Sequence, residues 1–282
     1  MKVLSDPQKL NKLVKEISCK KRSIGFVPTM GALHLGHLSL IKQAAKDNDI
    51  VVVSIFVNPA QFGPGEDLKK YPRSLKRDLE ICRRSKVDLV FLPSDNIMYP
   101  QGFSTFVNVE GLSNKLCGIF RPGHFRGVAT VVAKLINIVN PDVIYLGQKD
   151  AQQAIIISRM VKDLNFPVKI KVMPTLREKD GLALSSRNIY LEKAQRSDAL
   201  VLSKALSLAK SMINCGQRDC VRIINRMKQL IAKKKQIKVE YISIVDLEKL
   251  EDIKKINQSC LIALAVKIGK TRLIDNFIFN YA

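Results

Sequence analysis

The stretch "FVPTMGALHLGHLSL", residues 26–40, joins a hydrophobic run to a glycine-rich turn and then to an apolar, helix-like segment. A strand that turns directly into a helix is the building unit of parallel α/β sheets. The turn also contains two of the three histidines of the chain, His34 and His37. This stretch therefore indicates a fold class and a candidate binding site at the same place.

The two histidines have the spacing H-x-G-H. Glycines let the backbone approach a ligand, and a helix start offers amide groups and the positive end of its dipole to an anion. Residues three apart lie on one side of a helical turn, so both imidazoles can point at one phosphate chain. A lone histidine in such a place is usually structural, whereas the pair favours nucleotide binding. The lysine loop of P-loop enzymes and the G-x-G-x-x-G turn are missing, so neither class is indicated.

Outward from this turn, strands and helices alternate through the first 175 residues. Continuous apolar strands separated by helices of 10 to 15 residues are typical of a parallel sheet covered on both faces. We therefore predict a Rossmann-like, doubly wound α/β fold, with ligands bound beyond the carboxyl ends of its strands. The expected strands are residues 23–29, 50–58, 87–93, 142–147 and 168–174.

The pattern changes near residue 175. A polar, turn-rich stretch is followed by two long helices, at about 193–214 and 217–235, and by three strands whose alternation suits an antiparallel sheet with one solvated face. We expect two domains: residues 1–175 form the Rossmann-like domain, and residues 176–282 form a smaller C-terminal α+β domain.

Composition excludes several classes of protein. Hydrophobic residues make up 46% of the chain, as in soluble globular proteins. The strongest apolar run, residues 50–57, is too short for the roughly 20 residues that span a bilayer. The first 17 residues read as a strand and an amphipathic helix and not as a signal peptide. We expect a cytoplasmic protein with no membrane partner.

The net charge of +22 raises the question of a nucleic-acid partner. The lysines fall mostly on predicted helix faces or near turns, few aromatics are interleaved with them, and no nucleic-acid-binding motif accompanies them. We therefore expect a solvated basic surface and no nucleic-acid partner. Six scattered cysteines without a C-x-x-C pair predict neither disulfides nor a structural zinc site.

Six blocks of sequence resemble one family. H-x-G-H alone resembles the nucleotide-binding signature of the adenylyl-transferring superfamily that includes class I aminoacyl-tRNA synthetases. With the residues around it, the chain resembles the pantothenate synthetase family, the pantoate–β-alanine ligases, over essentially its whole length. The blocks are "PTMGALHLGH" (28–37), "FVNPAQF" (56–62), "YPR" (71–73), "RPGHFRGVATVVAKL" (121–135), "PDVIYLGQKDAQQ" (141–153) and "REKDGLALSSRNIYL" (177–191).

The resemblance implies a two-step ligation of pantoate and β-alanine. ATP and pantoate give pantoyl adenylate and pyrophosphate; the amine of β-alanine then attacks, which gives pantothenate and AMP. A carboxylate that attacks a polyanion needs positioning, preorganised positive groups and Mg²⁺, and no covalent enzyme nucleophile. The cysteines and the serines of "LSSR" are therefore not candidate nucleophiles. The family also implies a homodimer in which residues 1–175 bind ATP and pantoate and residues 176–282 form a lid domain.

The resemblance assigns the catalytic roles by position. His34 and His37 contact the ATP phosphates, and His37 is the expected proton donor to the departing pyrophosphate. Lys149 and Arg187 clamp the triphosphate from the far side, Arg187 through its planar fork. The "LSSR" segment corresponds to the mobile second signature of the superfamily. We therefore expect residues 182–188, in a polar stretch with little to hold it, to close as a lid.

The remaining ATP contacts follow from the same match. Gly147 and Asp150 suit the ribose hydroxyls, and Leu176 lines the adenine pocket through its backbone. Arg121 and His124 precede a helix and are expected to face the same cleft. The complete ATP-binding set expected is Met30, Gly31, Ala32, Leu33, His34, Leu35, Gly36, His37, Gly147, Gln148, Lys149, Asp150, Leu176, Leu184, Ser185, Ser186 and Arg187.

Neutral side chains are expected around pantoate. Gln61 and Gln153 can donate to and accept from its hydroxyls and carboxylate, and Met30 packs on its methyl groups. Asn58, with Gln61, is expected near the reacting carboxylate and β-alanine. For Mg²⁺, the family implies an acidic residue shortly after "YPR", and Asp78 is the candidate.

Two other functions stay open. A different adenylyltransferase, which keeps AMP in its product, would share H-x-G-H but would not require "FVNPAQF" or "RPGHF". A nucleic-acid binder is suggested by charge alone, and it does not explain why all three histidines fall inside these blocks.

Overall fold

The computed structural model describes residues 1–281. These residues form two compact units. The first unit consists of Met1–Ser113, Arg121–Gly147 and Ile156–Met173, and the second of Asn114–Phe120, Gln148–Ile155 and the segment that starts at Pro174. The domain division at residue 175 stays a prediction, which separate expression of the two fragments would test.

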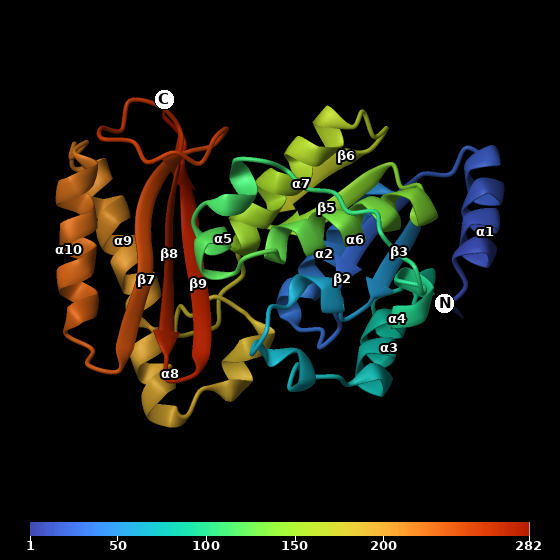
Figure 1. The fold of residues 1–282 in the computed structure, drawn as a ribbon, viewed down its shortest axis with the longest axis horizontal. Helices are drawn as coiled ribbons and strands as arrows, with labels where there is room; N and C mark the ends of the chain where they lie inside the picture. Colours follow the sequence, from blue (N-terminus) through green and yellow to red (C-terminus); the bar gives the residue numbers. More distant parts are fainter. Residues whose placement is uncertain (282) are drawn as a thin grey trace. The chain divides into compact units, whose positions relative to one another are not determined.

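The first unit contains a six-stranded sheet in the order β1-β4-β3-β2-β5-β6, in which all neighbouring strands are parallel (Figure 1). β2 and β3 pair along their full length, from Ile24 opposite Ile50 to Thr29 opposite Ile55. The doubly wound parallel sheet predicted from the sequence is confirmed. Its strands are β1 (Lys2–Leu4), β2 (Ile24–Thr29), β3 (Ile50–Ile55), β4 (Leu89–Phe91), β5 (Val143–Gly147) and β6 (Lys169–Met173).

The strand order reverses at β2. From β2 the chain passes to β3 and β4 on one side, and it later returns to β5 and β6 on the other. In open α/β sheets, ligands bind beyond the carboxyl ends of the strands at such a switch point. Because β2 ends at Thr29, the fold places the turn with His34 and His37 next to this point.

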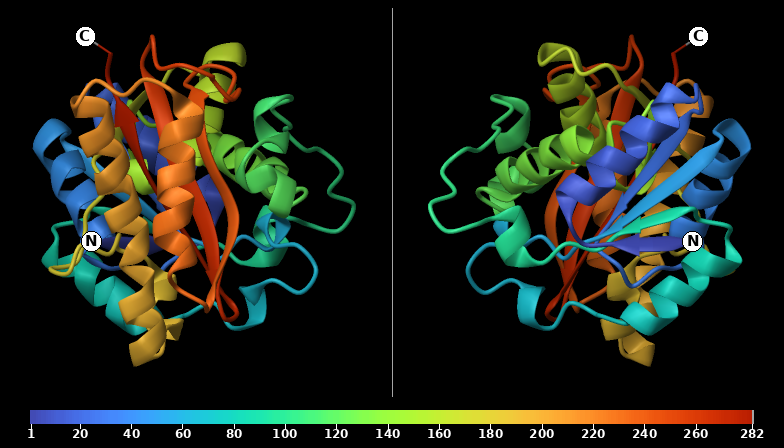
Figure 2. Two further views of the ribbon diagram at one scale, coloured as in Figure 1. Left: turned by 90° about the vertical axis from the view of Figure 1, so that its left-hand side faces the viewer. Right: turned by 90° about the vertical axis from the view of Figure 1, so that its right-hand side faces the viewer.

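Helices cover both faces of this sheet. On one face, Ile41 of α2 and Cys82 of α3 join buried strand side chains in a single hydrophobic cluster. On the other, α1 and α6 lie against each other, and Asn11 donates to the carbonyls of Asn137 and Ile138. Figure 2 shows these helices from two further sides. The helices are α1 (Pro7–Cys19), α2 (Leu35–Asp47), α3 (Leu75–Arg84), α4 (Asp95–Met98), α6 (His124–Val139) and α7 (Ala151–Asp163), which continues from the second unit into the first.

The second unit contains an antiparallel sheet in the order β7-β8-β9, as the sequence predicts. α9 and α10 lie side by side on one face of it (Figures 1 and 2) and share its hydrophobic core. The elements are α5 (Cys117–Phe120), α8 (Lys193–Ala199), α9 (Val201–Asn214), α10 (Cys220–Ala232), β7 (Ile237–Asp246), β8 (Cys260–Ile268) and β9 (Thr271–Phe279).

One helix expected over residues 193–214 is two helices in the structure. At Leu200 the backbone tightens to ψ −16°, and the Leu200 amide donates to the carbonyl of Asp198, two residues back. This contact interrupts the regular helical ladder between α8 and α9.

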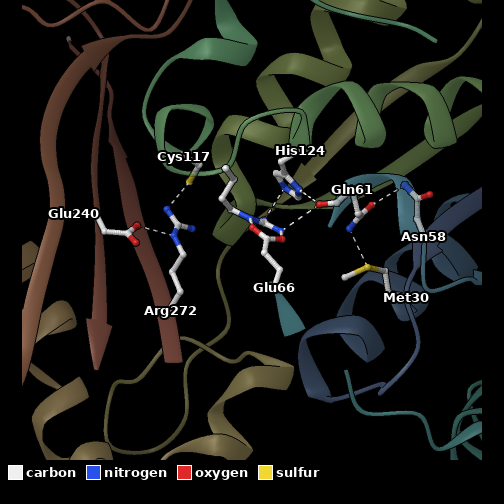
Figure 3. A network of polar contacts seen from close by, with 9 residues as sticks. Met30, Asn58, Gln61, Glu66, Cys117, His124, Glu240 and Arg272 are labelled. Atoms are coloured by element: carbon white, nitrogen blue, oxygen red, sulfur yellow. Dashed lines mark hydrogen bonds and ion pairs between the residues drawn. The ribbon is translucent and has the colours of Figure 1, made fainter. Parts of the chain in front are cut away.

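A buried polar cluster holds α5 to the strands of its own unit (Figure 3). The Sγ atom of Cys117 lies 3.4 Å from Nη2 of Arg272, which also pairs with Glu240 at 2.6 Å. The same Sγ atom lies 3.1 Å from the hydroxyl of Tyr241. Burial by itself lowers the pKa of Arg272, but its contacts with Cys117 and Glu240 raise that pKa overall, so the guanidinium stays charged. Cys117 therefore acts as a structural anchor.

No helix within residues 1–281 has both the length and the apolar character needed to cross a membrane.

Candidate active site

The turn after β2 is built from left-handed backbone. Gly31 has φ +81° and Ala32 has φ +50°. The hydroxyl of Thr29, at the end of β2, donates to the carbonyl of Ser54 on β3 at 2.7 Å and accepts the amide of Gly31 at 3.1 Å. These contacts tie the turn to the edge of the sheet and direct the chain into α2, which begins at Leu35.

Both imidazoles in this turn are oriented by the main chain. His34 is the N-cap of α2, and its Nδ1 accepts the amide of Gly36 at 3.1 Å, while Nδ1 of His37 accepts the amide of His34 at 3.3 Å. The two ring centroids lie 4.1 Å apart. An Nδ1 that accepts a hydrogen bond carries no proton, so these contacts assign the ring proton to Nε2. Nε2 is therefore the nitrogen from which each ring can donate a hydrogen bond.

The main-chain amides of the turn are used inside the protein. The sequence predicts amides open to an anion here, but five of them have a protein acceptor. These five amides are therefore not the open donors that the sequence predicts for an anion. The five amides are those of Gly31, Ala32, Leu33, His34 and Gly36.

Asp78, the expected Mg²⁺ ligand, lies under this turn. It is 2% exposed, and its two oxygens accept the amides of Ala32 and Leu33, both at 2.8 Å. Mg²⁺ demands a near-octahedral shell of oxygens and usually keeps several waters. Among residues 1–281, no cluster of three or more His, Cys, Asp or Glu side chains could hold a metal ion. The geometry therefore does not fit Asp78 as a metal ligand.

Asn58 and Gln61 form a chain of amides after β3 (Figure 3). Asn58, 1% exposed, donates from Nδ2 to Oε1 of Gln61 and to the carbonyl of Gly127, both at 3.1 Å. Its Oδ1 accepts the hydroxyl of Tyr99 at 2.6 Å and the amide of Ala60 at 3.3 Å. All four hydrogen-bonding positions of Asn58 are thus used inside the protein. The geometry therefore does not favour the expected contact with β-alanine; Asn58 orients Gln61 instead.

The orientation of the Gln61 amide follows from this chain. The Gly127 carbonyl can only accept and the Ala60 amide can only donate, so the Asn58 side chain has one possible orientation. Gln61 must then turn Oε1 toward Asn58 and Nε2 toward Met30, whose sulfur lies 2.9 Å away. Sulfur is a weak acceptor, so a substrate oxygen can replace it. The structure thus brings together Gln61 and Met30, both expected at the pantoate site.

A second chain of contacts holds the main chain of Gln61. His124 contacts the Gln61 carbonyl through Nδ1 at 2.8 Å, and its Nε2 lies 2.9 Å from Nη1 of Arg121. Because a guanidinium only donates, the proton of His124 lies on Nδ1. Arg121 in turn pairs with both oxygens of Glu66, at 2.7 and 2.6 Å. Arg121 and His124, expected to face the cleft, thus support Gln61.

The charge of Glu66 follows from this pairing. Burial raises the pKa of Glu66, but its hydrogen bonds and charge contact with Arg121 outweigh burial and leave the pKa below its ordinary value. Glu66 therefore stays ionised beside Arg121 at neutral pH.

The residues after β5 are held in a different way. Gly147 ends β5 and has open space where a Cβ would lie, which permits a close approach to its backbone. In the second unit, Gln148 donates to Asn276 at 2.9 Å, and Asn276 donates to the carbonyl of Lys149 at 2.8 Å. The ammonium of Lys149 lies 3.1 Å from Oδ1 of Asp150. These contacts fix the backbone of the segment. The Lys149 ammonium forms its ion pair with the adjacent Asp150.

Gln153, expected at the pantoate site, lies partly exposed on α7. The preceding residue, Gln152, is 6% exposed and holds a neighbouring segment of the chain. It accepts a hydrogen bond from the amide of Cys117 at 3.0 Å and donates one to the carbonyl of Lys115 at 2.7 Å. The contact of Gln153 with pantoate stays a prediction.

The segment that contains "LSSR" is bonded within its own unit. Ala183 pairs with Arg177 in a short antiparallel bridge, and the amide of Leu184 donates to the carbonyl of Leu176 at 3.0 Å. The side chain of Asn188 donates to the carbonyl of Ala183 at 3.1 Å. These contacts hold the segment more firmly than the sequence indicates, and its closure as a lid stays a prediction.

The serines and Arg187 lie at the end of this bonded turn. Ser185 caps the short 3-10 helix Ser186–Tyr190 by accepting the amide of Arg187 at 3.3 Å. Leu184, Ser185, Ser186 and Arg187 are all partly exposed. Their contacts with ATP stay predictions.

Three residues that build this site were missed in the sequence. Glu66 and Tyr99 act through contacts across 55 and 41 residues, which no local pattern indicates. Gly127 did carry a signal, because a glycine inside the block "RPGHFRG" suggests a close backbone approach. A Cβ there would lie 2.2 Å from the carbonyl oxygen of Ala60.

Comparison with known proteins shows extensive similarity. A sequence model of the pantoate–β-alanine ligase family matches residues 2–278. The pantothenate synthetase of Thermodesulfovibrio yellowstonii is 52% identical over 279 residues, which are 99% of each chain. The pantothenate synthetase of Thermosipho africanus is 53% identical over 278 residues, 99% of this chain and 100% of the relative.

Two solved structures are similar along almost the whole chain. The crystal structure of pantothenate synthetase from Thermus thermophilus has 42% identity and a TM-score of 0.93, and the match covers 98% of this chain and 99% of that one. The pantoate–β-alanine ligase from Francisella tularensis, complexed with β,γ ATP and β-alanine, has 38% identity and a TM-score of 0.80 over 99% and 97% of the two chains.

Proposed function

The chain belongs to the pantoate–β-alanine ligase family. We propose that it joins pantoate to β-alanine through a pantoyl adenylate. In the first step, a carboxylate oxygen of pantoate attacks the α-phosphorus of ATP, and the bond to pyrophosphate breaks. In the second step, the amine of β-alanine attacks the activated carbonyl carbon, loses a proton and releases AMP. An amine does not displace an unactivated carboxylate at neutral pH, so activation must come first.

One observation carries the proposal: two imidazoles that each present an Nε2 donor beside the switch point of a parallel sheet. Their Nδ1 atoms are held by the main chain at 3.1 and 3.3 Å, so the donors are oriented before a ligand arrives. Donors fixed in advance stabilise developing phosphoryl charge without reorganising. His34 and His37 thus bind the ATP phosphates, and His37 assists the departing pyrophosphate.

Gln61 supplies pantoate recognition in this proposal. Since its Nε2 points away from Asn58, Gln61 acts as a donor, and it suits a carboxylate or hydroxyl oxygen. Met30, in contact with that amide, offers an apolar surface for the methyl groups of pantoate. Gln153 adds a second amide. Asn58 acts on both substrates through Gln61.

The second unit supplies positive charge. Lys149 and Arg187 offset the negative charge that builds on the phosphoryl oxygens, and the hydroxyls of Ser185 and Ser186 add donors. Gly147 and Asp150 bind the ribose, and the backbone of Leu176 binds adenine. Mg²⁺ enters as the counter-ion of the ATP phosphates; no step here depends on a protein ligand for it. We also propose that the enzyme is a cytoplasmic homodimer.

The test is an assay of products with ATP, pantoate and β-alanine, each omitted in turn. AMP should form only with all three substrates. Pyrophosphate should form in an amount equal to the enzyme when β-alanine alone is omitted, because the adenylate stays bound. Pyrophosphate release that strictly requires β-alanine would contradict the two-step reaction. A product that retains AMP would indicate a different adenylyltransferase.

A further inference from the structure

Asp78 contacts the turn after β2, which contains Gly31, Ala32 and Leu33. In the hydrogen bonds described, it meets this turn only through main-chain amides. It lies in the first turn of α3, 45 residues beyond Leu33, and its carboxylate accepts the amides of Ala32 and Leu33 at 2.8 Å each. The residue is 2% exposed, and within residues 1–281 it takes part in none of the ion pairs found. A buried carboxylate is costly unless its charge is compensated by hydrogen bonds.

The turn needs such a contact because of its backbone. Ala32 has φ +50°, a left-handed conformation that is unfavourable for a residue with a Cβ. Something in the surrounding structure must therefore hold it. The two amides that converge on Asp78 are those on either side of the Ala32 side chain, so the carboxylate stabilises this conformation directly.

Gly31 completes the fit. A Cβ on Gly31 would lie 2.9 Å from Oδ2 of Asp78 and 3.1 Å from Cγ2 of Ile55, and its φ is +81°. Only glycine lets the carboxylate lie this close to the turn. The turn and the carboxylate are therefore complementary in shape as well as in hydrogen bonding.

The same geometry opposes a metal-binding role. Both carboxylate oxygens are already bonded to amides in a nearly inaccessible position, whereas a Mg²⁺ ligand must meet an ion that usually keeps several waters. We infer that Asp78 is a positioning residue: it holds the Gly31–Leu33 turn so that His34 and His37 start α2 with their rings correctly placed. It is not a ligand of Mg²⁺.

The inference rests on the proposed function only in naming ATP as the ligand of this turn, so it is tested first without any substrate. Amide hydrogen exchange is measured on the complete, substrate-free enzyme and on Asp78→Asn. The asparagine keeps the size of aspartate, but it places an amide donor against one main-chain N–H. Exchange at Ala32 and Leu33 should become about 10- to 100-fold faster, since each amide loses a hydrogen bond to a charged group. Exchange in β2 and β3 should stay unchanged.

Kinetics then distinguish positioning from metal binding. Asp78→Asn should raise KM for MgATP about tenfold or more and slow pyrophosphate release, while the Mg²⁺ concentration for half-maximal rate stays the same. A metal ligand predicts the reverse: half-saturation at higher Mg²⁺ and recovery of the rate when Mg²⁺ is added. Glu80→Gln, which changes an exposed carboxylate on the same helix, is the matched control and should alter none of these values.

A second substitution provides rescue. Ala32→Gly in the Asp78→Asn background removes the Cβ that disfavours the left-handed conformation, and it should restore part of the MgATP affinity. Should Asp78→Asn prove too unstable to purify, Gly31→Ala disturbs the same contact from the other side and should speed exchange at Ala32 and Leu33 equally.

Unchanged exchange at these two amides, or recovery by Mg²⁺ in place of recovery by Ala32→Gly, would overturn the inference. If instead the parent enzyme released no pyrophosphate while the exchange result held, the proposed function alone would fail.

Discussion

The residues expected at the active site are held differently in the first unit and in the second. In the first unit, hydrogen bonds orient the side chains themselves: Nδ1 of His34 and Nδ1 of His37 each accept a hydrogen bond from a main-chain amide, and the Asn58 side chain fixes the amide of Gln61. In the second unit, contacts fix mainly the backbone, and the ammonium of Lys149 has the adjacent Asp150 as its ion-pair partner.

The difference indicates that the two units contribute in different ways, one through oriented hydrogen bonds and the other through charge. A hydrogen bond from a neutral donor depends strongly on direction. The orientation of such donors is therefore fixed by contacts within the folded protein. A charged group acts over a longer range and tolerates a looser position. Substitutions in the first unit should therefore act through geometry, and those in the second through charge.

The largest effect is expected at His37, where geometry and chemistry can be separated. Asparagine can place its oxygen near the position of Nδ1, so His37→Asn should keep the contact with the His34 amide but lose the Nε2 donor. Pyrophosphate release should fall about 10²- to 10⁴-fold, with unchanged stability. His37→Ala should lose the same activity. It should also lower the free energy of unfolding by about 1 kcal/mol, because the hydrogen bond from the His34 amide at the start of α2 is lost. Equal pyrophosphate release by His37→Asn and the parent would remove His37 from the chemistry.

A charge substitution in the second unit should cost somewhat less. Lys149→Met keeps the length of the side chain and removes the ammonium, so the rate of adenylate formation should fall about 10²- to 10³-fold, with a smaller change in KM for MgATP. The control is Lys162→Met, an exposed lysine near the end of α7. A change in KM alone would show that Lys149 binds ATP without stabilising the transition state.

Asn58 tests geometry without charge at the phosphates. Asn58→Leu has a similar size and no charge, and it cannot donate to Gln61 or to the carbonyl of Gly127, so the Gln61 amide loses its fixed direction. KM for pantoate should rise about 10- to 100-fold, while KM for MgATP changes little. Tyr99→Phe removes one neutral hydrogen bond to Asn58 and leaves its donors intact, so its effect should stay within about tenfold. Equal increases in KM for MgATP and in KM for pantoate in Asn58→Leu would contradict the distinction between the two units.

The smallest effect concerns stability and pH. The pKa of Glu66 in the folded protein lies below its ordinary value of 4.5. The carboxylate thus contributes stability above that ordinary value, and this contribution is lost as the pH falls through the lower, folded pKa. Urea unfolding of Glu66→Gln at pH 7 should show a loss of about 1.5 to 3 kcal/mol, and the difference from the parent should shrink near pH 3.

The exposed pair of Glu80 and Arg84 provides the control for that experiment. Glu80→Gln should cost at most about 0.5 kcal/mol at pH 7. If Glu66→Gln cost no more than this, the contacts of Arg121 would not stabilise the region around Gln61.

The fold was largely predictable because hydrophobic periodicity is local. The runs that became β2, β3 and β5 are continuous and apolar, and they indicated the parallel sheet and the place of the two histidines after a strand. The strand order, and with it the switch point at β2, came only from the structure. The break at Leu200 was not predictable, because the apolar pattern continues through it.

The supports of the site could not be predicted in the same way. Asp78 reads as one acidic residue on an amphipathic helix, and only the packing of α3 under the turn gives it two amides to accept. Asn58 was found through its block of sequence, but its role depends on Tyr99 and Gly127, which other elements bring to it. Motifs indicated the candidate site residues, and tertiary contacts determine how these residues are held.

The most direct test of the central claim follows oxygen from substrate to product. Pantoate labelled with ¹⁸O in its carboxylate is converted with ATP and β-alanine, and the AMP is examined by mass spectrometry. Attack of the carboxylate on the α-phosphorus leaves one of its oxygens on that phosphorus when the amine displaces AMP. The account predicts one ¹⁸O atom in each AMP and none in pyrophosphate. Unlabelled AMP, or label in pyrophosphate or inorganic phosphate, would contradict it.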